Sequence, residues 1–239
     1  MRALVLLFFL ACQSVYGGVA ATLVLLPKDW DHKSPLPVAI WLHGYRANPS
    51  RIREDAHYQA TADALMIAVV GVPATREVGL DSFVWTEVPD FDFDQIQKAL
   101  REAERRSGAK FGPKVLLGFS QGAVVAAELA ARYPRIFAGA ILLSPGADIF
   151  PTPIGASEDN RCQRYFISIG SDEAEMNLKF ARAYRKVLSE LGSTVIYREV
   201  VGMKKHDRPP DWPDRFREWS AAILGHERKT PNVTPTSNP

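Results

Sequence analysis

The feature that most constrains the fold is the alternation of short apolar runs with segments of helical periodicity. Seven runs have the length and composition of strands: residues 22–26, 38–42, 66–71, 114–117, 140–143, 165–169 and 194–200. Five segments between them have apolar residues near helical spacing: residues 51–65, 94–107, 121–132, 175–191 and 214–224. Most of the strand-like runs are continuously apolar, which is typical of strands covered on both faces. The sequence therefore predicts an α/β fold, a doubly wound and mostly parallel sheet with helices on both faces.

Composition sets the size of this fold and excludes one class of partner. The chain has 239 residues, of which 46% are hydrophobic and 23% charged, as in an ordinary globular protein. We expect one domain over residues 18–225 and a disordered tail over residues 226–239, which is rich in proline and lacks large aromatic residues. The 29 basic and 27 acidic residues are scattered along the chain, so we expect no nucleic-acid partner.

The N-terminal residues have the charge and hydrophobicity pattern of a targeting segment. A positive charge at Arg2 precedes an apolar run over residues 3–11, which is too short to span a bilayer, and small polar residues follow. This pattern predicts a signal peptide over residues 1–17, with cleavage as late as residue 20, and a secreted or periplasmic protein without an integral membrane span. The alternative is a lipid anchor, because the residues ending at Cys12 resemble a lipoprotein cleavage box.

A serine between two glycines marks the candidate reactive centre. In Gly118-Phe119-Ser120-Gln121-Gly122, the serine stands where a buried strand gives way to a small-residue helix. A tight strand-to-helix turn of this kind leaves no room for side chains at its flanks and exposes the serine hydroxyl, as in a nucleophile elbow. The alternative is a glycine-bounded turn whose serine only caps the helix.

An oxyanion that forms at the elbow needs hydrogen-bond donors, and two segments are candidates to supply them. Trp41-Leu42-His43-Gly44-Tyr45 follows the second strand, where a glycine turn lets backbone amides approach the site. We expect the amides of Tyr45 and Gln121 to form an oxyanion hole. His43 is expected to shape this turn rather than to act as the base.

A serine nucleophile also needs a base and an orienting acid. His206 is the candidate base, because it lies in a polar loop after the last strand and fits the chain order serine, acid, histidine. The acid is expected after the strand that ends at Gly170, where Asp172 is favoured and Glu173 and Glu175 are the alternatives. Asp172 with Glu175 also resembles a capping box for the following helix.

These residues carry a family resemblance. Leu42-His43-Gly44, the elbow around Ser120 and the late His206 are similar to the α/β-hydrolase superfamily, within it to the phospholipase/carboxylesterase group that includes acyl-protein thioesterases, and to related secreted esterases. The resemblance spans nearly the whole chain after the signal segment and implies a serine esterase with Ser120 as nucleophile and His206 as base. Ala123 and Glu173 depart from the usual pattern of the family, and the second departure leaves the acid open.

The expected function is hydrolysis of a small-molecule carboxylic ester through an acyl-enzyme intermediate. Alternatives that keep the same triad are a carbohydrate or feruloyl esterase and a thioesterase, and a different class is a catalytically silent binding module on the same fold. No metal or organic cofactor is expected, because no ligand spacing recurs and no glycine-rich phosphate cradle is present. The aromatic residues of the segment 77–93 are expected either to wall the substrate pocket or to pack in the core. The oligomeric state stays open.

Overall fold

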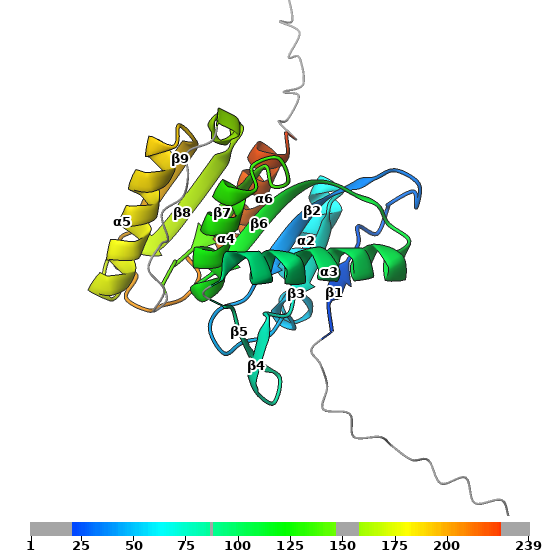
Figure 1. Cartoon of the computed structure of the whole chain (residues 1–239), viewed down its shortest axis with the longest axis horizontal. Coiled ribbons are helices and arrows are strands. Elements are labelled where there is room, and N and C mark those ends of the chain that lie inside the picture. The colour runs from blue at the N-terminus through cyan, green and yellow to red at the C-terminus, as the bar shows by residue number, and fades with distance from the viewer. Residues whose placement is uncertain (1–20, 87, 147–157, 226–239) are drawn as a thin grey trace, which may run out of the picture.

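The computed structural model describes residues 21–86, 88–146 and 158–225 (Figure 1). The predicted signal peptide, the lipid-anchor alternative at Cys12 and the predicted tail from residue 226 lie outside the described residues. Within them, no helix is both long and apolar enough to cross a membrane.

One seven-stranded sheet forms the centre of the molecule, in the order β1-β3-β2-β6-β7-β8-β9 (Figure 1). Its strands are β1 (Leu23–Leu25), β2 (Leu36–Leu42), β3 (Ala68–Val72), β6 (Phe111–Phe119), β7 (Gly139–Leu143), β8 (Arg164–Gly170) and β9 (Thr194–Val200). Every neighbouring pair is parallel except β1 with β3, which is antiparallel. The prediction of a doubly wound, mostly parallel sheet is confirmed, and the antiparallel edge strand was not predicted.

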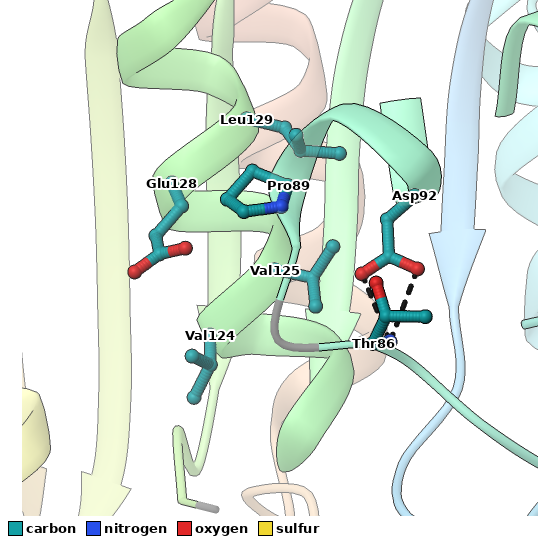
Figure 2. Close-up of a pocket in the computed structure, with 7 residues that line it drawn as sticks. All are labelled: Thr86, Pro89, Asp92, Val124, Val125, Glu128 and Leu129. Atoms are coloured by element: carbon teal, nitrogen blue, oxygen red, sulfur yellow. Dashed lines mark hydrogen bonds between the residues drawn. The ribbon is translucent and has the colours of Figure 1, made fainter. Parts of the chain in front are cut away.

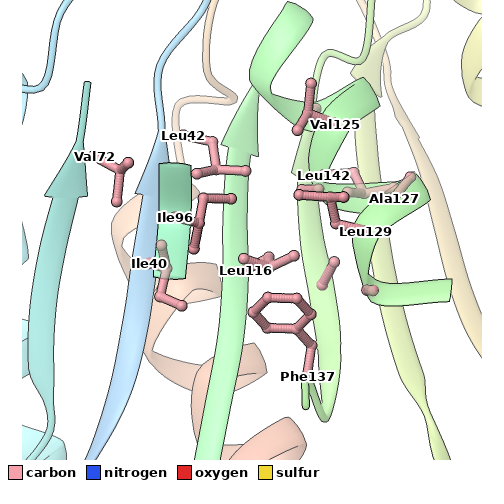
Figure 3. Close-up of a cluster of buried hydrophobic side chains, with 14 of the residues drawn as sticks. Ile40, Leu42, Val72, Ile96, Leu116, Val125, Ala127, Leu129, Phe137 and Leu142 are labelled. Atoms are coloured by element: carbon pink, nitrogen blue, oxygen red, sulfur yellow. The ribbon is translucent and has the colours of Figure 1, made fainter. Parts of the chain in front are cut away.

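Helices cover both faces of the sheet, because the strands carry apolar side chains on both sides. The helices are α1 (Arg51–Glu54), α2 (Ala56–Leu65), α3 (Pro89–Ser107), α4 (Gln121–Arg132), α5 (Glu175–Glu190) and α6 (Trp212–Leu224). Side chains of α3, α4 and α5 share one buried cluster with alternate strand residues, among them Ile96 and Leu116 (Figure 3). Side chains of α1, α2 and α6, among them Tyr58 and Phe216, pack in a second cluster on the other face.

Several element boundaries differ from the sequence-based expectation, and three of these differences have local reasons. The segment expected as one helix over residues 51–65 is split at Asp55, whose side chain accepts a hydrogen bond from the His57 amide and caps α2. Met66 ends α2 in the left-handed conformation, so β3 starts two residues later than expected. Helix α3 begins five residues earlier than expected, with Pro89 in its first turn, a position that proline favours.

A two-stranded hairpin, β4 (Arg76–Gly79) and β5 (Ser82–Val84), and a short 3-10 helix (Glu158–Cys162) were not predicted. The hairpin follows the carboxyl end of β3 and is tied to the loop after β2, because the Phe83 amide donates to the carbonyl of Ala47 over 2.9 Å. It therefore lies on the edge of the sheet where β2 and β6 also end.

The order of the strands fixes where a site can form. Strand β2 has β3 on one side and β6 on the other, with Leu42 beside Gly118 at their carboxyl ends. The chain leaves these two strands toward opposite sides of the sheet, which opens a crevice at this point in α/β folds. The loops after β2 and β6 are those that carry the candidate oxyanion amides and Ser120.

Candidate active site

Ser120 lies in a strained turn between β6 and α4. Its backbone has φ 54° and ψ −121°, a conformation that L-residues rarely adopt. The Ser120 amide donates to the carbonyl of Leu143 at the end of β7 over 3.1 Å, which holds the turn against the neighbouring strand. The side chain is consequently directed out of the sheet, at the N-terminal end of α4.

The two flanking glycines are required by close backbone contacts. A Cβ atom at Gly118 would lie 2.3 Å from the carbonyl oxygen of Gly122, and one at Gly122 would lie 2.1 Å from that of Leu42. Both distances are far below van der Waals contact. The spacing glycine, serine, glycine is therefore set by how closely α4 packs on β6 and β2.

His206 reaches Ser120 from the loop between β9 and α6. Its Nε2 atom lies 2.7 Å from Ser120 Oγ, and the ring of Phe119 lies beneath the imidazole with 5.2 Å between centroids. A neutral imidazole with Nε2 unprotonated accepts the serine hydroxyl proton in this geometry. The hydroxyl has a second acceptor in the carbonyl oxygen of Gly146, at 3.0 Å.

The loop that carries His206 is anchored directly after this residue. Ser144 Oγ donates to the carbonyl of Asp207 over 2.7 Å. The guanidinium of Arg208 pairs with Asp55 at 3.0 Å and lies 4.1 Å above the ring of Trp212. These contacts fix the backbone on the residue after the imidazole, so the ring is held toward Ser120.

Glu173 is the carboxylate that contacts His206. Its Oε1 atom accepts a short hydrogen bond from His206 Nδ1, and its side chain is only 1% exposed. Asn177 Nδ2 donates to the same oxygen over 2.7 Å. This arrangement fixes the tautomer of His206 with the proton on Nδ1, because a carboxylate accepts and does not donate.

The structure places Glu173 against His206, and not Asp172, the residue favoured from the sequence as the orienting acid. Asp172 is exposed, its carboxylate accepts from Ser171 Oγ, and its amide donates to the carbonyl of Met203. The turn after Gly170 therefore directs residue 172 outward and residue 173 inward, and the direction of this turn decides which carboxylate meets His206. Glu175, the other alternative, is exposed and pairs with Lys179.

The capping alternative for this segment is not observed either. Helix α5 begins at Glu175 with Ala174 as its N-cap, and no side chain caps it. Asp172 is thus neither the partner of His206 nor the cap of the helix.

The loop after β2 packs directly against the elbow. A Cβ atom at Gly44 would lie 3.2 Å from Ser120 Cβ, so glycine permits this approach. The next residue is Tyr45, and Gln121 is the first residue of α4, where helix amides have no intrahelical acceptor. Neither backbone amide has a hydrogen-bond acceptor among the described residues. Both of the amides expected to bind an oxyanion are therefore free to donate.

His43 is a buried neutral histidine with both ring nitrogens engaged. Its Nε2 atom accepts from the Ala74 amide over 3.1 Å, and its Nδ1 atom donates to the carbonyl of Gly44 over 2.8 Å. Burial lowers the pKa of the imidazole to about 4. These contacts agree with the expectation that His43 shapes the turn and is not the base.

A cavity of about 260 Å³ adjoins the elbow between the loop after β2 and the loop of His206. Its walls include Trp41, Gly44, Ala47, Arg51, Phe119 and Asp207. Its volume is sufficient for a short acyl or alcohol group. None of the described residues of the segment 77–93 lines it: Phe83 and Trp85 are buried in the core and Phe91 is largely exposed.

The described residues hold no group of three or more histidine, cysteine, aspartate or glutamate side chains placed to bind a metal ion. Three contacts near the elbow were missed by sequence reasoning. Asn177 touches the acid, Gly146 accepts from Ser120, and Trp85 binds the side chain of Gln121. No sequence motif marks these contacts, because each depends on segments that meet only in the folded chain.

Comparison with protein families gives one match over most of the chain. The model of the Esterase family, with the description "Putative esterase", matches residues 16–169, more than half of the chain. The chain is also 29% identical over 124 residues to "Putative esterase NocK" of Nocardia uniformis subsp. tsuyamanensis. That match covers 48% of this chain and 36% of NocK, so the chain spans about a third of the length of this curated relative.

Solved structures share the fold at low sequence identity. The carboxylesterase of Bacillus cereus has a TM-score of 0.60 at 18% identity, covering 84% of this chain and 93% of its own. A ferulic acid esterase has a TM-score of 0.64 at 16% identity, with 84% and 90% covered. Acyl-protein thioesterase 2 of Zea mays has a TM-score of 0.57 at 16% identity, with 86% and 100% covered. These structures have the same sheet and helix arrangement as this chain.

Proposed function

The chain belongs to the Esterase family, and we propose that within it the protein is a serine hydrolase that cleaves carboxylic esters through an acyl-enzyme intermediate. The predicted resemblance to an esterase group of the α/β-hydrolase superfamily is confirmed by this family match and by the shared fold of the solved esterases. Ser120 is the proposed nucleophile, His206 the base and Glu173 the orienting acid, and the amides of Tyr45 and Gln121 form the proposed oxyanion hole.

The proposed first step is acylation. Ser120 Oγ attacks the ester carbonyl while its proton passes to His206 Nε2, 2.7 Å away. The Glu173 carboxylate accepts from Nδ1 and stabilises the imidazolium that forms. The carbonyl oxygen becomes an oxyanion near the N-terminus of α4, where free amides and the helix dipole favour negative charge. His206 then donates its new proton to the leaving alcohol oxygen, and the carbon–oxygen bond to the alcohol breaks.

The proposed second step is hydrolysis of the acyl-enzyme. Water loses a proton to His206 Nε2 as its oxygen attacks the acyl carbonyl, and the same amides bind the second oxyanion. The bond to Ser120 Oγ breaks, His206 returns the proton to it, and the carboxylic acid leaves. The chain of contacts from Ser120 Oγ through His206 to the buried Glu173 carboxylate is the observation that carries this proposal.

Hydrolysis of p-nitrophenyl esters by a matched pair of serine variants tests the proposal. Ser120→Ala is expected to lower kcat by at least about 10⁴-fold, because the nucleophile is lost. Ser107→Ala is the control, since Ser107 Oγ bonds the carbonyl of Ala103 at the end of α3 and its loss does not touch the elbow. Equal activity of Ser120→Ala and the native protein would contradict the proposal, and a native protein without any activity would favour the silent binding module.

The proposed substrate is a small ester, because the cavity of about 260 Å³ beside the elbow accommodates a short acyl or alcohol group. The solved neighbours include a ferulic acid esterase and an acyl-protein thioesterase, so aromatic esters and thioesters are the alternatives that keep the same mechanism. A panel of acetyl, butyryl and octanoyl p-nitrophenyl esters, methyl ferulate and an acyl thioester separates them. The proposal expects the highest kcat/KM for the short acyl chains.

We also propose that the protein is exported, on the grounds of the charged and apolar pattern of residues 1–17 alone. N-terminal sequencing of the protein recovered from a bacterial periplasm is expected to start between residues 18 and 21. A mature chain that begins at a lipid-modified Cys12 would support the anchored alternative instead.

A further inference from the structure

Trp85 binds two separate segments that meet at the elbow. It follows β5 directly and is only 2% exposed. Its backbone amide donates to Gln121 Oε1 over 3.2 Å, and its carbonyl accepts from Gln121 Nε2 over 3.3 Å. Its indole Nε1 donates to the carbonyl of His43 over 2.8 Å. A single residue thus contacts both the start of α4 and the loop after β2.

The two partners are next to the amides of the proposed oxyanion hole. Gln121 supplies one of these amides itself, as the first residue of α4. His43 precedes Gly44, which packs on Ser120, and Tyr45, which supplies the other amide. An oxyanion hole works only when its donors are held in advance about 2.7–3.1 Å from the position of the oxyanion. The proposed oxyanion hole therefore requires a fixed distance between the start of α4 and the loop after β2.

Within the part of the chain that the structure describes, the side chain of Gln121 has no hydrogen-bond partner other than Trp85. Both polar atoms of its side-chain amide bond to Trp85, and the residue is 5% exposed. An unpaired polar group in such a place costs free energy, so the side chain is held to Trp85. The first turn of α4 is consequently tied to the segment after β5 as well as to β6.

The segment that carries Trp85 is itself firmly held. The Thr86 amide donates to both carboxylate oxygens of Asp92, at 3.1 Å each, as Figure 2 shows. Phe83, two residues before Trp85, is paired with Ala47 in the loop after β2. The backbone on both sides of Trp85 is therefore fixed, so Trp85 can hold Gln121 and the carbonyl of His43 in place.

We propose that Trp85 is a positioning residue that sets the distance and orientation of the two oxyanion amides. This inference rests on the proposed serine hydrolase function. The indole N–H holds the carbonyl of His43 and so orients the Gly44–Tyr45 backbone, while the backbone of Trp85 holds Gln121 through its side chain. Trp85 does not touch the substrate, and its effect reaches the reaction only through these two amides.

Trp85→Phe is the first test, because phenylalanine keeps much of the ring packing and removes the indole N–H. We expect kcat to fall by about 10- to 100-fold with KM nearly unchanged, less than the loss from deleting an oxyanion donor outright. The affinity for an alkyl trifluoromethyl ketone, which adds Ser120 and forms an oxyanion, is expected to fall by the same factor. A packing defect alone lowers stability without this parallel loss.

Trp219→Phe is the matched control. Trp219 is also buried and stacks on Phe166 with 5.0 Å between centroids, on the face of the sheet covered by α6. This variant makes the same change of ring in the core without removing a contact to the elbow. We expect it to keep the kcat and the ketone affinity of the native protein.

Gln121→Met provides a second route if Trp85→Phe fails to fold. Methionine has a similar length, keeps the backbone amide of residue 121 and loses both bonds to Trp85. We expect kcat and ketone affinity to fall together in this variant as well. In the double variant Trp85→Phe/Gln121→Met, we expect the fold-loss of kcat to be smaller than the product of the two single losses. Native kcat and ketone affinity in either folded single variant would overturn the role of Trp85, whereas a native protein with no Ser120-dependent activity would overturn the proposed function instead.

Discussion

Glu173 places its buried carboxylate against Nδ1 of His206. Asp172, the preceding residue, is exposed and bonded to Ser171. We therefore expect Glu173→Gln to lower kcat by about 10²- to 10⁴-fold, since a neutral amide neither stabilises the imidazolium nor enforces the tautomer. Asp172→Asn, the matched control, is expected to keep kcat within about threefold of native. Steady-state hydrolysis of a p-nitrophenyl ester measures both, and the opposite ranking would restore Asp172 as the acid.

The close contact between Gly122 and Leu42 gives a stability prediction. A Cβ atom at position 122 would lie 2.1 Å from the Leu42 carbonyl oxygen, so backbone has to move to accept it. We expect Gly122→Ala to lower the free energy of unfolding by about 3 kcal/mol or more and to abolish activity. Gly112→Ala is the control, because its nearest neighbour to a new Cβ is 3.8 Å away. Urea denaturation measures both, and equal midpoints for the two variants would refute the steric account of the elbow.

The buried imidazole of His43 predicts acid sensitivity. Burial lowers its pKa from 6.5 to about 4, so the unfolded chain binds a proton in this window and the native chain does not. The free energy of unfolding therefore falls as pH drops from about 6.5 to 4, by roughly 3 kcal/mol at most from this group. Asp92 acts in the opposite direction, because burial raises its pKa to about 6 and its protonation favours the native state.

The contribution of His43 is isolated by comparison with His43→Asn. Denaturation at a series of pH values is expected to show a steeper loss of stability below pH 6.5 in the native protein than in this variant. Parallel curves for the two proteins would show that His43 is not the group responsible. Asp92 is unchanged in both proteins, so its opposite effect cancels in the difference.

The cavity beside the elbow predicts a change of substrate range. Ala47 lies on its wall, and Ala47→Phe is expected to fill part of the 260 Å³. We expect kcat/KM to fall by about tenfold or more for a butyryl or aromatic ester and to change little for an acetyl ester, in line with the cost of one misfitting hydrophobic group. Ala60→Phe, at an exposed position of α2, is the control. An equal loss for all esters in Ala47→Phe would indicate damage to the loop rather than occupation of the cavity.

Local sequence patterns were sufficient to predict the sheet and the elbow. Continuous apolar runs predicted the parallel strands, and the spacing of Gly118, Ser120 and Gly122 located the strained turn. These features are local, since each depends on residues close together in the chain. The antiparallel pairing of β1 and the β4–β5 hairpin depend on long-range contacts and on a short strand with exposed residues, and periodicity carries no signal for either.

The sequence alone could not identify the carboxylate that contacts His206, and the reason is physical. Three carboxylates follow Gly170, and which of them turns inward depends on the path of the backbone after β8. The Asp172 amide bonds to the Met203 carbonyl, a contact across 31 positions in sequence, and this contact directs residue 173 toward His206. Trp85 was interpreted as a possible pocket wall for a similar reason, because its partners at positions 43 and 121 are distant in the chain.

Covalent labelling of Ser120 tests the central claim most directly. The native protein treated with an alkyl fluorophosphonate and digested is expected to carry one adduct, located by mass spectrometry on the peptide that contains Ser120. Ser120→Ala is expected to take up no label, and Glu173→Gln to take it up more slowly than the native protein. A native protein that stays unlabelled at Ser120, or an equally labelled Ser120→Ala variant, would contradict the assignment of this residue as the nucleophile.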